Sequence, residues 1–189
     1  MRNETKTFEQ KMQEVWDRQE IEQLMYRHAR SLDRMDAELM KSCYWEEGIE
    51  ELEDPMMPEN LSYNGSAWNF VPGMMDGFKM IKRTQHRISN IYIELDGNKA
   101  NAESYVWAYN LYDVENVEKE TIVGGRHYFD LEKRDDEWRI LHRVTSFDWN
   151  QNNNSTSVWS DNRSDKYKAK RDFTGVGYDY VETQKKINE

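Results

Sequence analysis

Residues 121–149 read TIVGGRHYFDLEKRDDEWRILHRVTSFDW. Two runs rich in β-branched and aromatic residues lie on either side of the charged segment RDDE at 134–137, a pattern typical of antiparallel strands joined by a turn. The pair Gly124-Gly125 lacks the GxGxxG spacing and the following helix of a phosphate-binding loop. We therefore interpret it as a bulge or sharp bend that lets a sheet curl.

Two earlier runs extend the predicted sheet, IYIEL at 91–95 and AESYVWAYNLYDV at 102–114, and Asp96-Gly97 between them favours a tight turn. Residues 8–34 predict a long helix, because apolar residues recur at helical spacing along one face. That stripe consists of Ile21, Leu24, Met25, His28 and Leu32. Helices followed by a meander of strands predict an α+β domain, with helices on one face of a curved antiparallel sheet.

The segment between the first helix and the sheet carries weaker signals. A second helix is predicted at 36–47, with Asp36 as its N-cap and Gly48 at its end. Proline and glycine punctuate residues 55–75, which favours a long loop, or a loop with a short strand, of the kind that often frames a site. A short helix is expected at 77–84.

The length of 189 residues predicts one domain, which we place at 1–150. A polar linker and C-terminal tail are expected at 151–189, because NQNNNSTSVWSDNRSD at 150–165 is low in complexity. The tail either ends freely or folds back over a partner or a pocket. A content of 7 Trp, 11 Tyr, 6 Phe and 10 Met argues against general disorder, although 33% of residues are charged.

The charge and cysteine content exclude several classes of protein. A net charge of −10 argues against nucleic-acid binding, which needs clustered lysine and arginine. The single cysteine, Cys43, cannot form an intramolecular disulfide. The start MRNETKTFEQ lacks the apolar region of a signal peptide, and no run of 18 apolar residues occurs. These features predict a cytoplasmic protein without a membrane span.

Asp33 and His28 are candidate functional residues of the first helix. Asp33 follows Tyr26 by seven residues and lies at the edge of the apolar stripe. There it can orient an imidazole in a partly buried cavity, or it is a surface acid or a cap of the next element. His28 lies inside the stripe, where a histidine is either a satisfied core residue or a functional one. At 100° per residue the two are about 140° apart, so they can flank one cavity.

His86 and Arg143 are the candidates of the sheet. A histidine at the start of a strand is a natural general base at neutral pH, and a hydrogen-bonded carboxylate would fix its tautomer. Arg143 alternates with Leu141, Thr145 and Phe147 on one strand face, opposite Ile140, His142 and Val144. The pattern does not decide which face is inward. An arginine on a largely apolar face needs a partner, either a buried acid or a substrate anion.

Metal and nucleophile signals are weak. The sequence has no HExxH, no CxxC and no GxSxG motif, and Cys43 lies in an ordinary helical pattern. His127 and His142 could meet across paired strands, but two histidines without an added carboxylate are weak evidence for a metal site. We therefore expect proton abstraction without a metal, and not acyl transfer.

The order of these motifs resembles the SnoaL-like group of the nuclear-transport-factor-2-like superfamily. The first is RHARSLDRMD at 27–36, followed by an H-x-x-x-N motif from His86 to Asn90 and by DGNKANAE at 96–103. The last is GGRHYFDLEKRDDEWRILHR at 124–143, with a late Asp-Trp pair. No single motif is specific, but their order and spacing are, and together they cover roughly residues 10–150.

The pattern is most similar to the branch that contains scytalone dehydratase, lindane dehydrochlorinase and bile-acid dehydratase. The resemblance implies a cone-shaped α+β barrel with a deep apolar pocket, no cofactor and often a trimer. It also implies that Asp33 and His86 form a catalytic dyad and that Arg143 matches a functional arginine. His28 occupies a second functional position, where relatives often have Tyr or Lys, so its role as an acid for the leaving group is open.

The leading hypothesis is a cofactor-independent lyase of the dehydratase or dehydrohalogenase type, or an isomerase. His86 would take a proton from carbon, Asp33 would hold it, His28 or Tyr26 would assist the leaving group, and Arg143 would hold a polar or anionic group. A bulky aromatic, terpenoid or steroid-like substrate is expected, because Met and aromatic residues gather at 56–80. The candidate substrate-binding residues are Tyr26, Trp68, Phe70, Met74 and Phe147, with Met56, Met57 and Met75 nearby.

Two alternatives remain open. One is a non-catalytic protein of the same fold that binds a small molecule. The other is the small subunit of a ring-hydroxylating dioxygenase, which contributes no metal ligands. Aromatic residues on both faces of the 102–114 strand predict a homo-oligomer, with a trimer favoured over a dimer, because only one face can line the cone.

Overall fold

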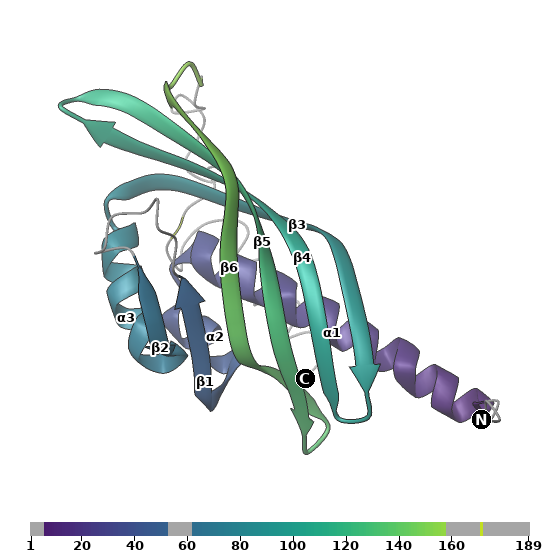
Figure 1. Ribbon diagram of the computed structural model, residues 1–189. Coiled ribbons are helices and arrows are strands. Elements are labelled where there is room, and N and C mark those ends of the chain that lie inside the picture. Colours follow the sequence, from purple (N-terminus) through teal and green to yellow (C-terminus); the bar gives the residue numbers. More distant parts are fainter. Residues whose placement is uncertain (1–5, 53–61, 158–170, 172–189) are drawn as a thin grey trace, which may run out of the picture.

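The computed structural model describes residues 6–52, 62–157 and 171. The helices are α1 (Phe8–Arg34), α2 (Ala37–Ser42) and α3 (Ala67–Phe78). The strands are β1 (Tyr44–Leu52), β2 (Tyr63–Ser66), β3 (Ile81–Asp96), β4 (Lys99–Val114), β5 (Val117–Arg134) and β6 (Glu137–Asn154). They form a six-stranded sheet in the order β2-β1-β6-β5-β4-β3. Figure 1 shows the three helices on one face of this sheet.

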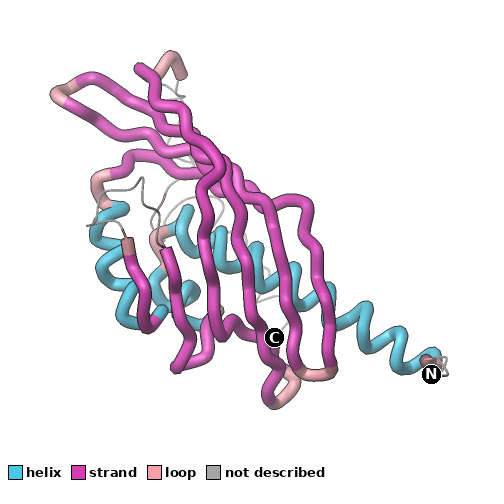
Figure 2. Tube along the Cα trace, viewed as in Figure 1, coloured by secondary structure: helices cyan, strands magenta, loops and turns pink. Residues whose placement is uncertain are grey.

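The predicted fold class is confirmed: helices near the N-terminus pack on a curved sheet in an α+β arrangement. Two details differ from a closed antiparallel barrel. The sheet is open, with β2 and β3 at its two edges. It is also mixed, because β1 runs parallel to β6 while all other neighbours are antiparallel. Figure 2 shows the long strands bending across the helices.

Two irregularities bend the longest strands. The register between β5 and β6 shifts at Gly124/Gly125, which confirms the predicted bulge. Glycine is required there, because a Cβ on Gly124 would lie 2.3 Å from the Trp149 ring and one on Gly125 would lie 2.2 Å from the Ser146 carbonyl oxygen. A second shift follows at Asp130/Leu131.

The long helix α1 begins with a capping box, in which Thr7 and Gln10 bond to each other's backbone N–H groups. Its buried residues begin only at Asp17, so the first turns extend beyond the sheet, as Figure 1 shows. Asp17 fixes the helix to the sheet, because it accepts a hydrogen bond of 2.9 Å from the Trp138 indole and pairs with Lys133 at 3.0 Å. No helix in the described part of the chain has the length and apolarity to cross a membrane.

The predicted helix at 36–47 was wrong beyond Ser42. Residues from Tyr44 to Leu52 form β1 instead, because they pair with β6 on one side and β2 on the other. Gly48 lies inside this strand, where a Cβ would come within 3.2 Å of three atoms, so it does not end a helix. Tertiary pairing here overrides local helix signals.

The segment at 62–84 also differs from the prediction. Residues 67–78 form a helix, although Pro72 and Gly73 suggested a loop, because Ala67, Val71 and Met75 bury one face of it. The helix expected at 77–84 is absent, and β3 already begins at Ile81. The strand β6 continues to Asn154, past the expected domain boundary at 150. Residues 53–61 and nearly all of the expected tail lie outside the described residues, so the domain boundary stays a prediction.

Candidate active site

Asp33 and His86 meet where the end of α1 crosses β3. The Asp33 Oδ1 lies 2.7 Å from the His86 Nδ1, so the hydrogen bond expected from the sequence is present. Asp33 also accepts hydrogen bonds from the Thr84 hydroxyl at 2.7 Å and from the His86 backbone N–H at 3.0 Å. Three donors from β3 therefore hold one carboxylate, and both partners are largely shielded from solvent.

The protonation of this pair follows from its hydrogen bonds. Burial alone would raise the pKa of Asp33, but the bonds from His86 and Thr84 together lower it below the ordinary value. Asp33 is thus an ionised acceptor, and the proton between the two groups belongs to Nδ1 of His86. In the neutral form of this ring, the other nitrogen, Nε2, carries the lone pair that can accept a proton. The ring of Phe78 stacks against His86 at a centroid distance of 6.4 Å.

Arg143 is buried and forms a two-point ion pair with Glu50 on β1. Its Nε lies 2.9 Å from Oε2 of Glu50 and its Nη2 lies 2.5 Å from Oε1. Burial acts to lower the pKa of Arg143, but the Glu50 carboxylate raises it above the ordinary value, so the side chain stays charged. Of the two partners left open by the sequence, a buried acid is the one present.

A bulge in β6 explains why the strand faces could not be assigned from alternation. Leu131 pairs with Ile140 and Asp130 pairs with His142, so Leu141 is the extra residue. Ile140 and Arg143 therefore both face the helices, although an uninterrupted strand would place them on opposite sides.

Tyr44 connects this ion pair to His28. The Tyr44 hydroxyl donates to Glu50 at 2.7 Å and accepts from Nε of Arg143 at 3.1 Å. His28 Nε2 lies 2.9 Å from the same hydroxyl and must be the donor there, because the Tyr44 proton is already used. Burial and the nearby charge of Arg143 hold the pKa of His28 well below its usual range, so His28 is neutral.

His127 completes this buried network from β5. Arg143 Nη1 donates to its Nε2 at 3.2 Å, which leaves the ring proton on Nδ1. Burial and Arg143 also hold the pKa of His127 well below its usual range. His127 and His142 do not meet, since His127 pairs with Thr145, and His142 contacts Glu51 and Asp130 on the other face. In the part of the chain that the structure describes, no three His, Cys, Asp or Glu residues are arranged to hold a metal ion.

Sequence reasoning missed the contributions of Glu50, Tyr44 and His127. Glu50 lies in the acidic run EEGIEEL, and nothing in that run distinguishes it from its neighbours. Tyr44 was assigned to a helix, which concealed its place in the sheet. His127 alternates with Phe129 and Leu131, so strand periodicity was the signal that could have placed it inside.

The structure does not bring all expected substrate-binding residues to this cluster. Tyr26 and Trp68 are 42% and 37% exposed. Phe70 and Met74 on α3 are half-buried against the core, with Phe70 beside the Tyr63 ring at 4.8 Å. Phe147 is half-buried on β6. Met56 and Met57 lie outside the described residues.

One residue of the C-terminal part, Arg171, contacts the body of the domain. It donates to the carbonyl oxygens of Phe78 and Ile81, and its Nη2 lies 3.0 Å from the sulfur of Met35. These contacts lie at the end of α1 that carries Asp33. The other residues of the expected tail, 158–170 and 172–189, lie outside the described residues.

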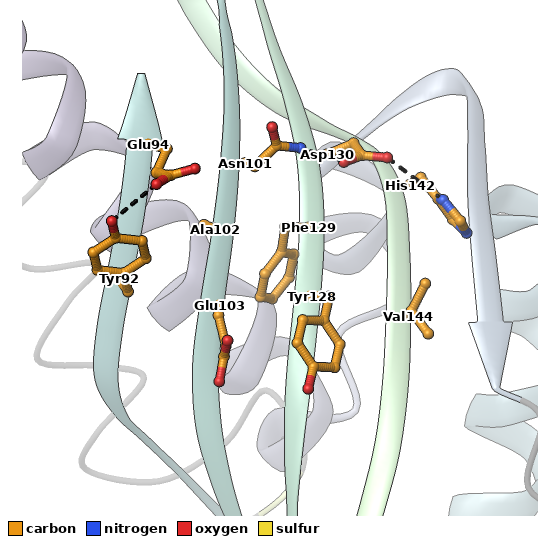
Figure 3. A pocket seen from close by; sticks show the side chains of 10 residues that line it. All are labelled: Tyr92, Glu94, Asn101, Ala102, Glu103, Tyr128, Phe129, Asp130, His142 and Val144. Atoms are coloured by element: carbon orange, nitrogen blue, oxygen red, sulfur yellow. Dashed lines mark hydrogen bonds and ion pairs between the residues drawn. The ribbon is translucent and has the colours of Figure 1, made fainter. Parts of the chain in front are cut away.

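A separate groove of about 310 Å³ lies on the outer face of the sheet. Figure 3 shows its side chains on β3, β4, β5 and β6, with the helices behind the sheet. Tyr92, Tyr128 and Val144 supply apolar surface, and Glu94, Glu103 and Asp130 supply negative charge. The groove is open and does not include Asp33 or His86, so the buried cluster on the other face is the better candidate for chemistry.

The model of the SnoaL-like domain matches residues 13–144. The chain belongs to this family. This confirms the family resemblance expected from the motif order. No curated protein sequence matches the chain.

Solved structures of the SnoaL-like fold superpose on the chain. A scytalone dehydratase candidate from Novosphingobium aromaticivorans is 20% identical with a TM-score of 0.62, covering 77% of this chain and 93% of its own. The type 2 hexachlorocyclohexane dehydrochlorinase LinA is 15% identical with a TM-score of 0.66, and the match covers 79% of this chain and 97% of the LinA chain. The Kfla4162 protein from Kribbella flavida is 17% identical with a TM-score of 0.64, and the match covers 72% of this chain and 94% of the Kfla4162 chain. At these identities the likeness shows the fold.

The buried neutral histidines predict acid-sensitive stability. Unfolded histidines take up protons as the pH falls through about 6.5, whereas His28 and His127, with lowered pKa values, stay neutral in the folded chain. The unfolded state then binds more protons, so the free energy of unfolding decreases with falling pH. The slope for each histidine should rise from about 0.7 kcal/mol per pH unit at pH 6.5 toward about 1.4 kcal/mol per pH unit near pH 5.

Urea unfolding at a series of pH values measures this slope. His28→Gln and His127→Gln should each reduce the slope of unfolding free energy against pH by the contribution of one histidine. Ser89→Ala, at an exposed position on β3, is the control, because it neither adds nor removes a titrating group. A free energy of unfolding that is constant between pH 6.5 and 5 would contradict the neutral, buried state of both rings.

Proposed function

We propose that this chain is a cofactor-independent lyase of the dehydratase or dehydrohalogenase type, or an isomerase acting by proton abstraction. The observation that carries the proposal is the 2.7 Å hydrogen bond from His86 Nδ1 to the ionised Asp33. It fixes the tautomer in which Nε2 is a base, and the carboxylate stabilises the imidazolium that forms. Membership of the SnoaL-like family and the enzymes among its structural neighbours support this function.

In the proposed reaction, Nε2 of His86 takes a proton from a carbon atom of the substrate. The electron pair of the C–H bond forms the new double bond, and the leaving group departs from the adjacent carbon with the electrons of its own bond. When the leaving group is hydroxide, the imidazolium of His86 returns the proton to it and water is released. When a halide leaves, the imidazolium later loses its proton to solvent. In an isomerisation the same proton returns to another carbon.

The buried network changes the roles proposed for His28 and Arg143. A neutral His28 that donates to Tyr44 is a poor acid, so we assign it the positioning of Tyr44 in place of protonation of a leaving group. Arg143 is already neutralised by Glu50, so we assign it the positioning of Tyr44 and His127 in place of capture of a substrate anion. His86 then serves as both base and acid.

The proposed substrate is a bulky, mainly apolar small molecule of the aromatic, terpenoid or steroid-like class. Phe78 of α3 stacks on the His86 ring, and Met25 on α1 and Val106 on β4 are apolar side chains buried between the helices and the sheet. The experiment is to incubate panels of alcohols and halides of these classes in deuterated water and to follow elimination and C–H exchange by mass spectrometry. Exchange or elimination that depends on His86 supports the proposal, whereas its absence with every bound compound favours a binding protein.

We also propose that the chain forms a homo-oligomer, with a trimer favoured, through the outer face of the sheet. Tyr92, Tyr105, Tyr128 and Trp149 are exposed on this face, which is more aromatic surface than a solvated sheet needs. Light scattering at micromolar concentration should give three times the 22.8 kDa of one chain. Tyr105→Glu should shift the mass toward the monomer, and Trp16→Glu on α1 should not. A clean monomer for the unaltered chain would contradict the proposal.

A further inference from the structure

Ser104, His127 and Thr145 form a row across the helix-facing side of the sheet. Ser104 on β4 is directly opposite His127 on β5, and His127 is directly opposite Thr145 on β6. Their exposed fractions are 0%, 5% and 5%. Neither the proposed proton transfer nor the ion pair of Arg143 uses the two hydroxyl groups of this row.

Both hydroxyl groups lack a partner within the described residues. The Oγ of Ser104 and the Oγ1 of Thr145 are buried without a hydrogen bond. A buried hydroxyl without a partner destabilises a fold relative to a paired one. Two such groups on either side of one histidine are a feature that a bound ligand would explain.

His127 adds a third donor to the row. Its Nε2 accepts from Arg143 at 3.2 Å, so its proton is on Nδ1. The row therefore combines two hydroxyl groups with a neutral imidazole N–H. Such a set of donors suits an oxygen atom with free lone pairs.

The surrounding charges select an uncharged oxygen. Arg143 is the cation beside this row, and Glu50 already holds it at two points. A carboxylate or phosphate would enter a buried site without a free positive charge, which is unfavourable. A carbonyl or hydroxyl group carries no such cost.

We propose that the row of Ser104, His127 and Thr145 binds uncharged carbonyl or hydroxyl oxygen at the end of the substrate remote from the reacting carbon, with each oxygen atom contacting two neighbouring members of the row. His86 on β3 is directly opposite Ala108 on β4, and Ser104 lies four residues before Ala108. Four residues of a strand span about 13 Å, so the row lies about that far from His86 along the sheet. This separation exceeds the distance between the two carbons of an elimination. The substrate class, which rests on the proposed function, is then an elongated apolar molecule with an oxygen group at the end away from His86.

A matched pair of small probes tests the row without any turnover. The probes are 1-tetralone, which has a carbonyl group, and tetralin, which has the same ring frame without it. Calorimetric titration of the unaltered chain should show 1-tetralone binding at least tenfold more tightly than tetralin. In the double variant Ser104→Ala/Thr145→Val the ratio should fall to near one, and in Ser89→Ala, an exposed position on β3, it should stay unchanged.

Thermal unfolding of the double variant gives a second, independent measurement. Because both hydroxyls lack partners, their removal should leave the midpoint unchanged or raise it. An unchanged probe ratio in the double variant, or a midpoint that falls by several degrees, would overturn the proposal. A ratio near one in the unaltered chain would do the same.

His86→Ala separates this inference from the proposed function. The probe ratio should persist in His86→Ala, because the row does not include that residue. If the ratio persists but turnover does not depend on His86, the elimination chemistry fails and the oxygen site stands. If turnover depends on His86 but the double variant keeps its probe ratio, the oxygen site alone fails.

Discussion

Replacing His86 by alanine should lower kcat about 10²- to 10⁴-fold on any substrate whose C–H bond is broken, because a positioned general base contributes a factor of this size. The loss should appear in kcat more than in KM, since the imidazole acts mainly in the transition state. Folding should stay intact, as judged by circular dichroism and the thermal midpoint. Steady-state kinetics and deuterium exchange measure the two effects.

Asp33→Asn is the second variant of this prediction. It keeps the shape of the side chain but removes the charge that stabilises the imidazolium, and it disturbs the tautomer set by the bond to Nδ1. Its loss of kcat should be large but no greater than that of His86→Ala. His142→Ala is the matched control, because His142 lies on the outer face beside Glu51 and Asp130. Turnover that survives His86→Ala unchanged would end the proton-abstraction proposal and favour a binding protein.

Glu50→Ala should destabilise the fold by about 3–5 kcal/mol, because it leaves the Arg143 charge buried without its partner. The Tyr44 hydroxyl would also lose its acceptor. Urea unfolding followed by tryptophan fluorescence measures the change. Such a loss is a large share of the stability of an ordinary domain, so part of the variant is expected to be unfolded at room temperature.

The neighbouring residue provides a close control for Glu50. Glu51→Ala removes the same kind of side chain one position along β1, but Glu51 is half-buried on the outer face and pairs with His142. Its effect should stay below about 1 kcal/mol. Glu50→Leu combined with Arg143→Met should recover much of the lost stability, because no charge then remains buried. Equal effects of Glu50→Ala and Glu51→Ala would contradict the assignment of a buried ion pair.

Local patterns were enough to predict α1, the three long strands β4 to β6 in outline, the last part of β3 and the turns between them. The apolar stripe of α1, the Asp96-Gly97 turn and the bulge at Gly124-Gly125 each depend on residues close together in the chain. The contact between Asp33 and His86, 53 residues apart, was predicted from their places beside apolar faces together with the resemblance to a family. The ranges 36–47 and 67–78 were misassigned, because packing against distant strands decided them.

The sequence by itself determined the order of the main helix and strands and the order of the motifs, and with them the fold class and the family. Only the tertiary structure decided which acid neutralises Arg143, because the acids of β1 look alike until β1 pairs with β6. It also decided that His28 is neutral, since burial and the charge of Arg143 set its pKa. The unpartnered hydroxyls of Ser104 and Thr145 follow from the register of three strands, which no single segment encodes. Local patterns fix what each segment forms, but the charge state and partners of buried groups depend on contacts between distant segments.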